Sequence, residues 1–190
     1  GDHVSIDPAI CGGCGMCGAV CPSGAAQTAF PPIDGSLTSL ANLLHYYGEA
    51  GGTAAQLLLH DGQWGGEMID MLARHGRGLP AALIPYEMHS VGRVGHDLLA
   101  GAVTLGFERV FVLMDPRKGP EYASLHQQVE LAEALLTGTG VASKNRFVLI
   151  DESDPDEVEQ IFWQKTKTSK YTPAPFAAMG SPRAVTRLGL

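Results

Sequence analysis

The chain has 190 residues, of which 45% are apolar and 17% are charged. This length accommodates one ordinary domain with a small appendage and excludes two large domains. No apolar run reaches the roughly 18 residues that a membrane span needs, so no membrane span is expected. The formal charge of -7 leaves no basic surface to neutralise phosphates, so neither nucleic acid nor an anionic membrane is expected as a partner.

The first segment, residues 1–33, is rich in Gly, Ala and Cys and too poor in large apolar side chains to make a core alone. All four cysteines of the chain lie in it, between Cys11 and Cys21. A tight local cluster suits a reducing compartment and a metal, whereas a disulfide framework spreads its cysteines. We therefore expect a cytoplasmic protein. The segment lacks signal-peptide features and does not begin with Met, from which we expect a piece of a longer chain.

Residues 34–164 alternate short apolar runs with amphipathic stretches. The predicted elements, in chain order, are a helix capped by Ser36 that ends before Gly51, a strand over 57–59, a helix over 68–76, a strand over 81–84 bracketed by Pro80 and Pro85, a helix over 94–105, a strand over 110–114, a helix over 125–138, a strand over 147–150, and a helix opened by Asp154 and Pro155.

Continuous apolar strands separated by helices indicate a parallel sheet covered on both faces. The predicted fold class is α/β, with a small doubly wound parallel sheet of four main strands. Right-handed crossovers most simply give the flavodoxin-like order, in which the second strand lies outside the first. Residues 165–190 turn to Lys, Thr, Ser and Pro, which predicts an exposed linker or arm.

The cysteines follow the spacing C-x2-C-x2-C-x3-C-P, at Cys11, Cys14, Cys17 and Cys21, which is the bacterial ferredoxin run. Two-residue gaps wrap the backbone around one iron–sulfur cube, and the interleaved glycines permit close wrapping and positive φ angles. We predict that these thiolates are the ligands of a 4Fe-4S cluster and assign no residue a catalytic role. Structural zinc, which usually takes two separated pairs, and disulfides formed after cluster loss are the alternatives.

The same spacing leaves the cluster ligands incomplete. In two-cluster ferredoxins the first three cysteines of a run bind one cube and the fourth binds the other. By that rule Cys11, Cys14 and Cys17 lack a fourth ligand, and Cys21 belongs to a second cluster. No cysteine follows Cys21. We therefore expect further ferredoxin segments of the same longer chain as partners, and an incomplete, labile or absent cluster in this chain by itself.

Four further motifs lie at 78–80, 90–94, 98–106 and 110–113. Through these motifs the stretch 79–150 resembles the delta subunit of methyl-viologen-reducing hydrogenase. It implies electron transfer between a hydrogenase or formate dehydrogenase and heterodisulfide reductase. The family's two-iron cluster is not implied, because residues 86–90 and 115–118 lack its cysteines. As a whole the chain resembles the middle section of large proteobacterial 4Fe-4S binding proteins, which implies flanking ferredoxin cysteines.

Loops at the carboxyl ends of parallel strands are where such folds bind ligands. A flavin stacked on Trp64 is an alternative cofactor, although no phosphate loop of flavodoxin type follows the first strand. Packing or an interface is the other role open to Trp64 and to Tyr86.

Charged and titratable side chains in these loops suggest weaker possibilities. His60 and His89 have Asp61 or Glu87 beside them as potential acid–base partners, but isolated histidines near carboxylates usually make surface hydrogen bonds. Arg117 and Lys118 are suited to neutralising a partner's carboxylate, and equally to a solvated loop.

Taken together, these patterns favour an iron–sulfur electron-transfer protein rather than a catalyst. The ferredoxin segment would relay single electrons, and the α/β domain would position redox protein partners. Two alternatives stay open, namely a flavin-containing oxidoreductase subunit and a docking module with a structural cluster.

Overall fold

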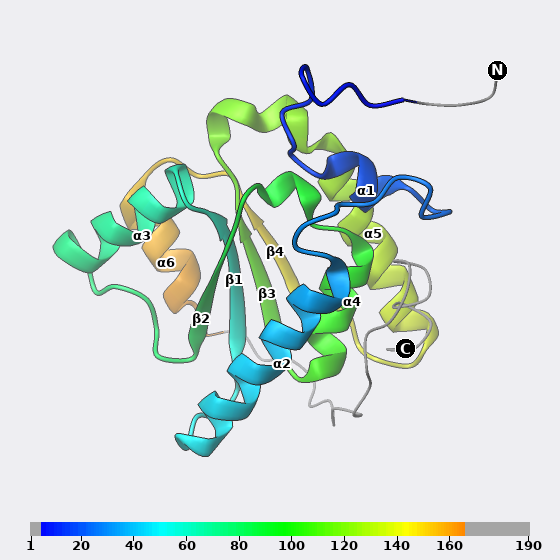
Figure 1. Cartoon of the computed structure of the whole chain (residues 1–190). Coiled ribbons are helices and arrows are strands. Elements are labelled where there is room, and N and C mark those ends of the chain that lie inside the picture. The colour runs from blue at the N-terminus through cyan, green and yellow to red at the C-terminus, as the bar shows by residue number, and fades with distance from the viewer. Residues whose placement is uncertain (1–4, 166–190) are drawn as a thin grey trace.

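The computed structural model describes residues 5–165 and has a parallel sheet at its centre (Figure 1). Its strands are β1 (Gln56–Asp61), β2 (Leu83–Met88), β3 (Arg109–Leu113) and β4 (Phe147–Ile150). They lie in the order β2-β1-β3-β4, and every neighbouring pair is parallel. The predicted α/β class, the four main strands and the position of the second strand outside the first are confirmed.

Helices cover both faces of the sheet (Figure 1). One face carries α2 (Ile33–Glu49), α4 (His96–Leu105) and α5 (Ala123–Gly138), and the other carries α3 (Trp64–His75) and α6 (Pro155–Trp163). A short helix, α1 (Met16–Val20), and two 3-10 helices, η1 (Val91–Arg93) and η2 (Pro116–Tyr122), complete the described elements.

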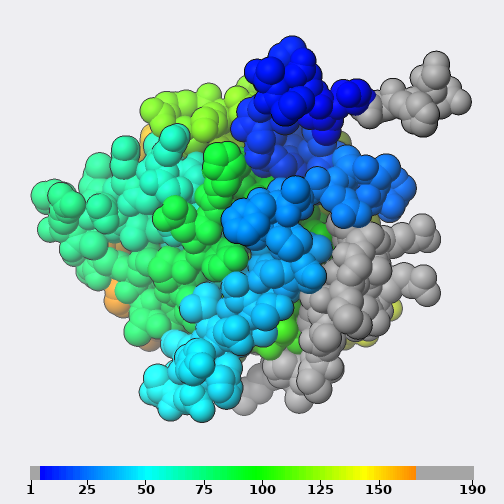
Figure 2. All heavy atoms as spheres, in the orientation of Figure 1, coloured from blue at the N-terminus to red at the C-terminus, as the bar shows by residue number. Residues whose placement is uncertain are grey.

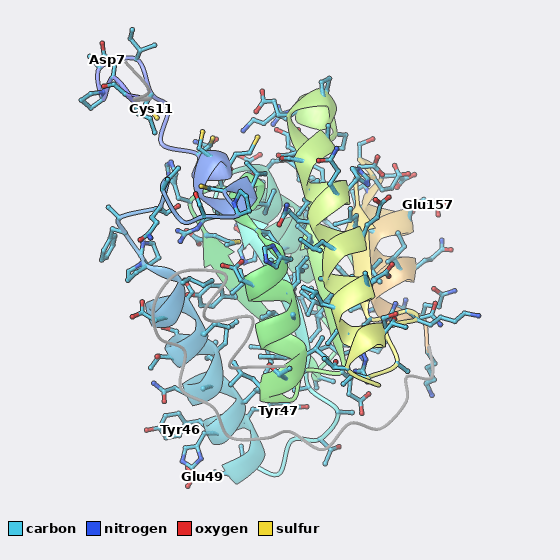
Figure 3. All side chains as sticks on the ribbon, turned by 90° about the vertical axis from the view of Figure 1, so that its right-hand side faces the viewer. Asp7, Cys11, Tyr46, Tyr47, Glu49 and Glu157 are labelled. Carbon is cyan, nitrogen blue, oxygen red and sulfur yellow. The ribbon has the colours of Figure 1, made fainter. Side chains whose placement is uncertain are left out.

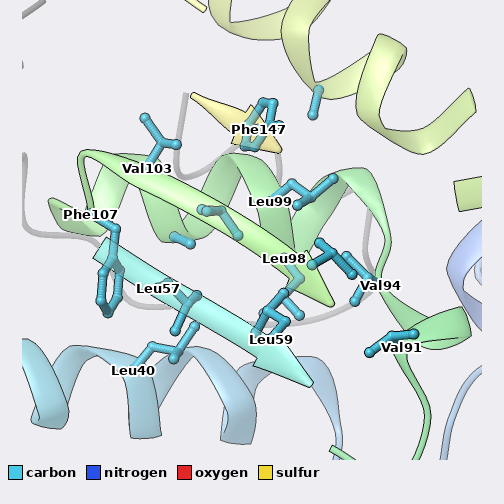
Figure 4. Close-up of a cluster of buried hydrophobic side chains, with 14 of the residues drawn as sticks. Leu40, Leu57, Leu59, Val91, Val94, Leu98, Leu99, Val103, Phe107 and Phe147 are labelled. Atoms are coloured by element: carbon cyan, nitrogen blue, oxygen red, sulfur yellow. The ribbon is translucent and has the colours of Figure 1, made fainter. Parts of the chain in front are cut away.

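The alternation of side chains along β1 divides the core into two layers. Leu57 and Leu59 point to the layer under α2, α4 and α5, while Leu58 points to the layer under α3 and α6. All three are fully buried. Figure 4 shows Leu57 and Leu59 facing Leu40 of α2 and lying near Leu98 of α4. A strand buried on both faces explains the continuous apolar runs in the sequence.

The starts of α2 and α4 differ from the sequence prediction. Ser36 was expected to cap α2, but the helix begins one turn earlier, at Ile33, with Pro32 in the capping position. Ser36 is instead buried inside the helix. The expected helix from Val94 starts at His96, because Val91–Arg93 forms a separate 3-10 turn.

The second strand is also longer than predicted. Pro85 was expected to end it, but β2 continues through Pro85 to Met88. Pro85 lies opposite Leu58 of β1, and β2 has no neighbour on its other side. An edge strand tolerates proline because the ring nitrogen faces away from the ladder. The carboxyl end of β2 therefore lies at Met88, and His89 and Ser90 follow it.

The last helix begins as predicted, since Asp154 accepts a hydrogen bond from the Asp156 amide and Pro155 is the first helical residue. In the described part of the chain, no helix combines the length and the apolar character that crossing a membrane requires. The predicted arm at 165–190 lies, except for Lys165, outside the described residues, and the three domain limits stay predictions.

Candidate metal centre

The four cysteines lie on and around α1. Cys11 and Cys14 are in the loop before the helix, Cys17 is in its first turn, and Cys21 follows its last residue. Gly13 and Gly15 bend this loop with φ angles of 68° and 80°, in the left-handed region that favours glycine. These two bends let the chain turn sharply between successive cysteines.

Backbone amides are directed at two of the sulfurs. The Gly13 N–H donates to Cys11 Sγ and the Ala26 N–H donates to Cys21 Sγ, each at 3.4 Å. The Ala26 amide and the Ser23 hydroxyl lower the pKa of the Cys21 thiol to about 7. Amide hydrogen bonds of this kind stabilise thiolates that bind iron.

The donor set fits an iron–sulfur cluster in its chemistry. All four cysteines are free thiols, three of them exposed and Cys21 partly so. Among residues 5–165 no three His, Cys, Asp or Glu side chains lie close enough together to hold a metal ion. Figure 3 shows Cys11 on a loop that projects beyond α1.

Close glycine contacts hold α1 against η1 and against the loop that contains Thr28. A Cβ on Gly15 would lie 2.9 Å from the Cβ of Arg93 in η1, and a Cβ on Gly18 would lie 3.1 Å from the amide nitrogen of Thr28. Arg93 also donates through Nη2 to the Pro31 carbonyl at 2.6 Å. Burial lowers the pKa of the Arg93 guanidinium. The cysteine segment (residues 5–33) therefore packs against η1, just beyond the carboxyl end of β2.

This packing places Cys14 near the carboxyl edge of the sheet, where parallel α/β folds bind ligands. Figure 2 shows the segment, in blue, packed on the body of the domain. A cavity of about 470 Å³ separates Cys14 and Met16 from the loops that follow β1, β2 and β3. The three loops contribute Gln63, Ser90 and Lys118, respectively, to the lining of this cavity.

The histidines and carboxylates of these loops lie in different environments. His60 is buried, and its Nδ1 lies 2.9 Å from the backbone carbonyl of Asp61. The Asp61 carboxylate accepts from the amides of Gln63 and Gly65, at 3.1 and 2.9 Å, at the start of α3. Local hydrogen bonds therefore explain both side chains. His89 is exposed and lines the cavity beside Cys14.

The two members of the positively charged loop after β3 have different surroundings. Arg117 donates twice to the buried carboxylate of Asp115, at 2.8 and 2.9 Å. That contact holds the pKa of Asp115 below its usual range. Lys118 instead lines the cavity. Trp64 is half-buried against the core layer under α3 and α6, which is a packing role.

Sequence reasoning missed the residues that join the two parts of the molecule. Arg93 contacts the cysteine segment, and Tyr122 lines the cavity, yet neither belongs to a recognisable motif. Their roles depend on contacts between η1, η2 and a segment distant in sequence. Only the glycines between the cysteines indicated the shape of the loop in advance, because left-handed turns favour glycine.

A run of four thiols in a glycine-bent loop, with amides directed at the sulfur atoms, defines a ferredoxin-type iron–sulfur site. Residues 4–27 match a family model described as the 4Fe-4S binding domain, Fer4. No curated protein matches the chain. The predicted ferredoxin motif and its 4Fe-4S binding site are thereby confirmed at the level of the domain.

Proposed function

We propose that the protein transfers single electrons through 4Fe-4S clusters bound by its cysteine segment. Cys11, Cys14 and Cys17 supply three ligands of one cluster, and Cys21 supplies a ligand of a second. The observation that carries this proposal is the ferredoxin cysteine run, matched by the 4Fe-4S family over residues 4–27. When bound, each cluster accepts and releases one electron, while the chain's own residues orient it and limit its contact with water.

We infer that a second ferredoxin segment completes both clusters. The sequence holds four cysteines, and two cubes need about eight thiolates. The cysteine segment also exposes apolar side chains, with Ile10 at 83% and Phe30 at 86% exposure. Exposed apolar residues at an incomplete site favour a covering partner. A companion cysteine-bearing segment, in the same longer chain, supplies both the ligands and the cover.

The α/β domain serves this function by holding the cysteine segment and presenting it to redox proteins. The contacts of η1 with Gly15 and of Arg93 with Pro31 support the first part of this role. The resemblance to the hydrogenase delta subunit supports the second. No catalytic group is proposed, and His60 and Asp61 are engaged in local hydrogen bonds.

Anaerobic reconstitution with iron and sulfide tests the proposal directly. The expected product binds no more than about four irons per chain and shows a broad absorption shoulder near roughly 400 nm that bleaches with dithionite. The matched variant Ser5→Cys adds a thiol outside the run and should not raise the iron content, whereas Cys14→Ser should lower it. Loading that Cys14→Ser leaves unchanged, or zinc retained in place of iron, would contradict the proposal, and resolved flavin bands would favour the flavin alternative.

A further inference from the structure

The crevice at the carboxyl edge of the sheet lies where doubly wound domains bind their ligands. The strand order reverses between β1 and β3, and such folds bind ligands outside the strand ends at that point. Gln63 follows β1 and Lys118 follows β3, so the two loops flank the reversal. The wall opposite these loops belongs to the chain's own cysteine segment, through Gly12, Cys14 and Met16.

We propose that this crevice is the α/β domain's binding site for the chain's own iron–sulfur cluster, with Lys118 setting its reduction potential. The inference rests on the proposed function. It gives the three loops a chemical role, since they face the cluster held by Cys14 and replace bulk water around it. The domain's ligand is then an iron–sulfur cube bound by thiolates, which leaves no place there for a flavin.

The packing of α1 supports this placement. The Met16 Cε lies 3.6 Å from the point where a Cβ on Gly92 would be, so the start of α1 rests on η1. The Ala19 carbonyl oxygen lies 3.3 Å from the corresponding point at Gly95. These contacts hold the helix against the sheet edge from both of its ends. Cys14, two residues before α1, lines the cavity of about 470 Å³ together with the loops at the strand ends.

The cavity lining supplies polar groups and charges of both signs. Lys118 contributes a positive charge, while Glu87 of β2 and Glu121, on the same 3-10 helix as Lys118, contribute negative ones. The turn that carries Lys118 is fixed, because its amide donates to the Asp115 carbonyl at 2.9 Å. Ser90 and Gln63 add a hydroxyl and an amide, which are donors suited to cluster sulfur.

The charges predict opposite shifts of the reduction potential. Reduction adds a negative charge to the cluster, so a nearby lysine favours the reduced form and a nearby glutamate opposes it. Lys118→Gln should weaken reduction by about three- to tenfold, the larger change being 59 mV for a one-electron couple. Glu121→Gln should shift the equilibrium by a similar factor in the other direction.

A redox titration of the cluster-loaded chain, followed by electron paramagnetic resonance, measures these shifts. Lys144→Gln is the matched control, because Lys144 is exposed and precedes β4, at the amino edge of the sheet. Its potential should equal that of the parent protein. Circular dichroism should show that all three variants are folded.

Nuclear magnetic resonance of the reduced, loaded chain locates the cluster without reference to potential. A paramagnetic cluster in the crevice should broaden the amide signals of Gln63, Ser90 and Lys118 and spare that of Lys144. If the cluster forms but these signals stay sharp and all three variants keep the parent potential, the crevice assignment is wrong and the proposed function stands. If no cluster forms even with a companion ferredoxin segment added, the proposed function itself is overturned.

Discussion

At the scale of single residues, glycines decide where the cysteine loop can bend and how closely it can approach η1. Gly15 needs both properties, because its φ angle is 80° and a Cβ there would lie 2.9 Å from the Cβ of Arg93. Gly12 needs neither, since a Cβ there would contact no atom within 4 Å. Two glycines of the same short loop therefore differ sharply in what they tolerate.

Gly15→Ala should loosen the cysteine segment. A left-handed alanine costs about 1–2 kcal/mol, and the contact with Arg93 adds to that cost. We expect roughly tenfold faster hydrogen exchange at the Ala19 amide, which donates to the Gly15 carbonyl at 3.2 Å. The iron content after reconstitution should fall with it. Gly12→Ala is the control, and equal effects of the two substitutions would show that Gly15 has no special role.

Asp115 gives a residue-scale prediction about pH. Its carboxylate is 2% exposed and accepts the Arg117 amide at 3.0 Å as well as the guanidinium. Because Arg117 lowers the pKa of Asp115, the carboxylate contributes stability that is present above its ordinary pKa of about 3.9 and lost as the pH falls through the lower folded value. Asp115→Asn should therefore lower the free energy of unfolding by about 1 kcal/mol at neutral pH.

Urea denaturation at pH 7 and at pH 3 checks this expectation. The difference in the free energy of unfolding between the parent protein and Asp115→Asn should be smaller at pH 3, because protonation of Asp115 weakens the same contacts in the parent protein. Asp70→Asn is the comparison, because Asp70 is 71% exposed and pairs with Arg74 at 3.4 Å on the surface of α3. Such a pair contributes little. A deficit of Asp115→Asn that is independent of pH would contradict the assignment.

At the scale of elements, apolar periodicity was sufficient to predict the sheet and its covering helices, but the predicted roles of Ser36 and Pro85 were wrong. Ser36 has the chemistry of a helix cap, but Leu37 and Leu40 bury that turn against the core, and the helix extends back to Pro32. Pro85 has the chemistry of a strand end, but an edge strand accommodates it. Both errors arise because tertiary position overrides local preference.

The element that joins the two parts of the molecule is η1, and Arg93 is its principal contact. Arg93→Ala removes the hydrogen bond to the Pro31 carbonyl at 2.6 Å. Hydrogen bonds of charged groups contribute about 1.5–3 kcal/mol, so we expect the cysteine segment to open roughly 10- to 100-fold more often. Limited proteolysis should cut the segment faster, while the unfolding midpoint of the α/β domain changes little. Arg93→Lys should restore part of the protection.

Arg74→Ala is the control for that experiment, because Arg74 is 73% exposed on α3. Proteolysis of the cysteine segment should be unaffected by it. Cleavage of the Arg93→Ala variant at the parent rate would mean that the glycine contacts alone hold the segment in place.

At the scale of the whole molecule, the sequence predicts cysteine ligands but not their surroundings. The spacing of the four thiols is a local property, and it is readable from eleven consecutive residues. The packing of the cysteine segment on η1 and the cavity that Lys118 lines are long-range properties. They are formed by loops about 50 to 100 residues away from the cysteines along the chain. No periodicity or motif encodes such a meeting, so the structure was needed to reveal it.

The exposed apolar side chains of the cysteine segment lead to the last prediction, which concerns assembly with a companion ferredoxin segment. Adding that segment in trans should raise the iron content from at most about four to about eight per chain. Phe30→Ser should weaken the association about tenfold or more, because burying a phenylalanine contributes about 1.5–3 kcal/mol. Leu43→Ser on α2, where Leu43 is 37% exposed, should not. Titration calorimetry compares the affinities, and equal losses for both variants would place the companion elsewhere on the molecule.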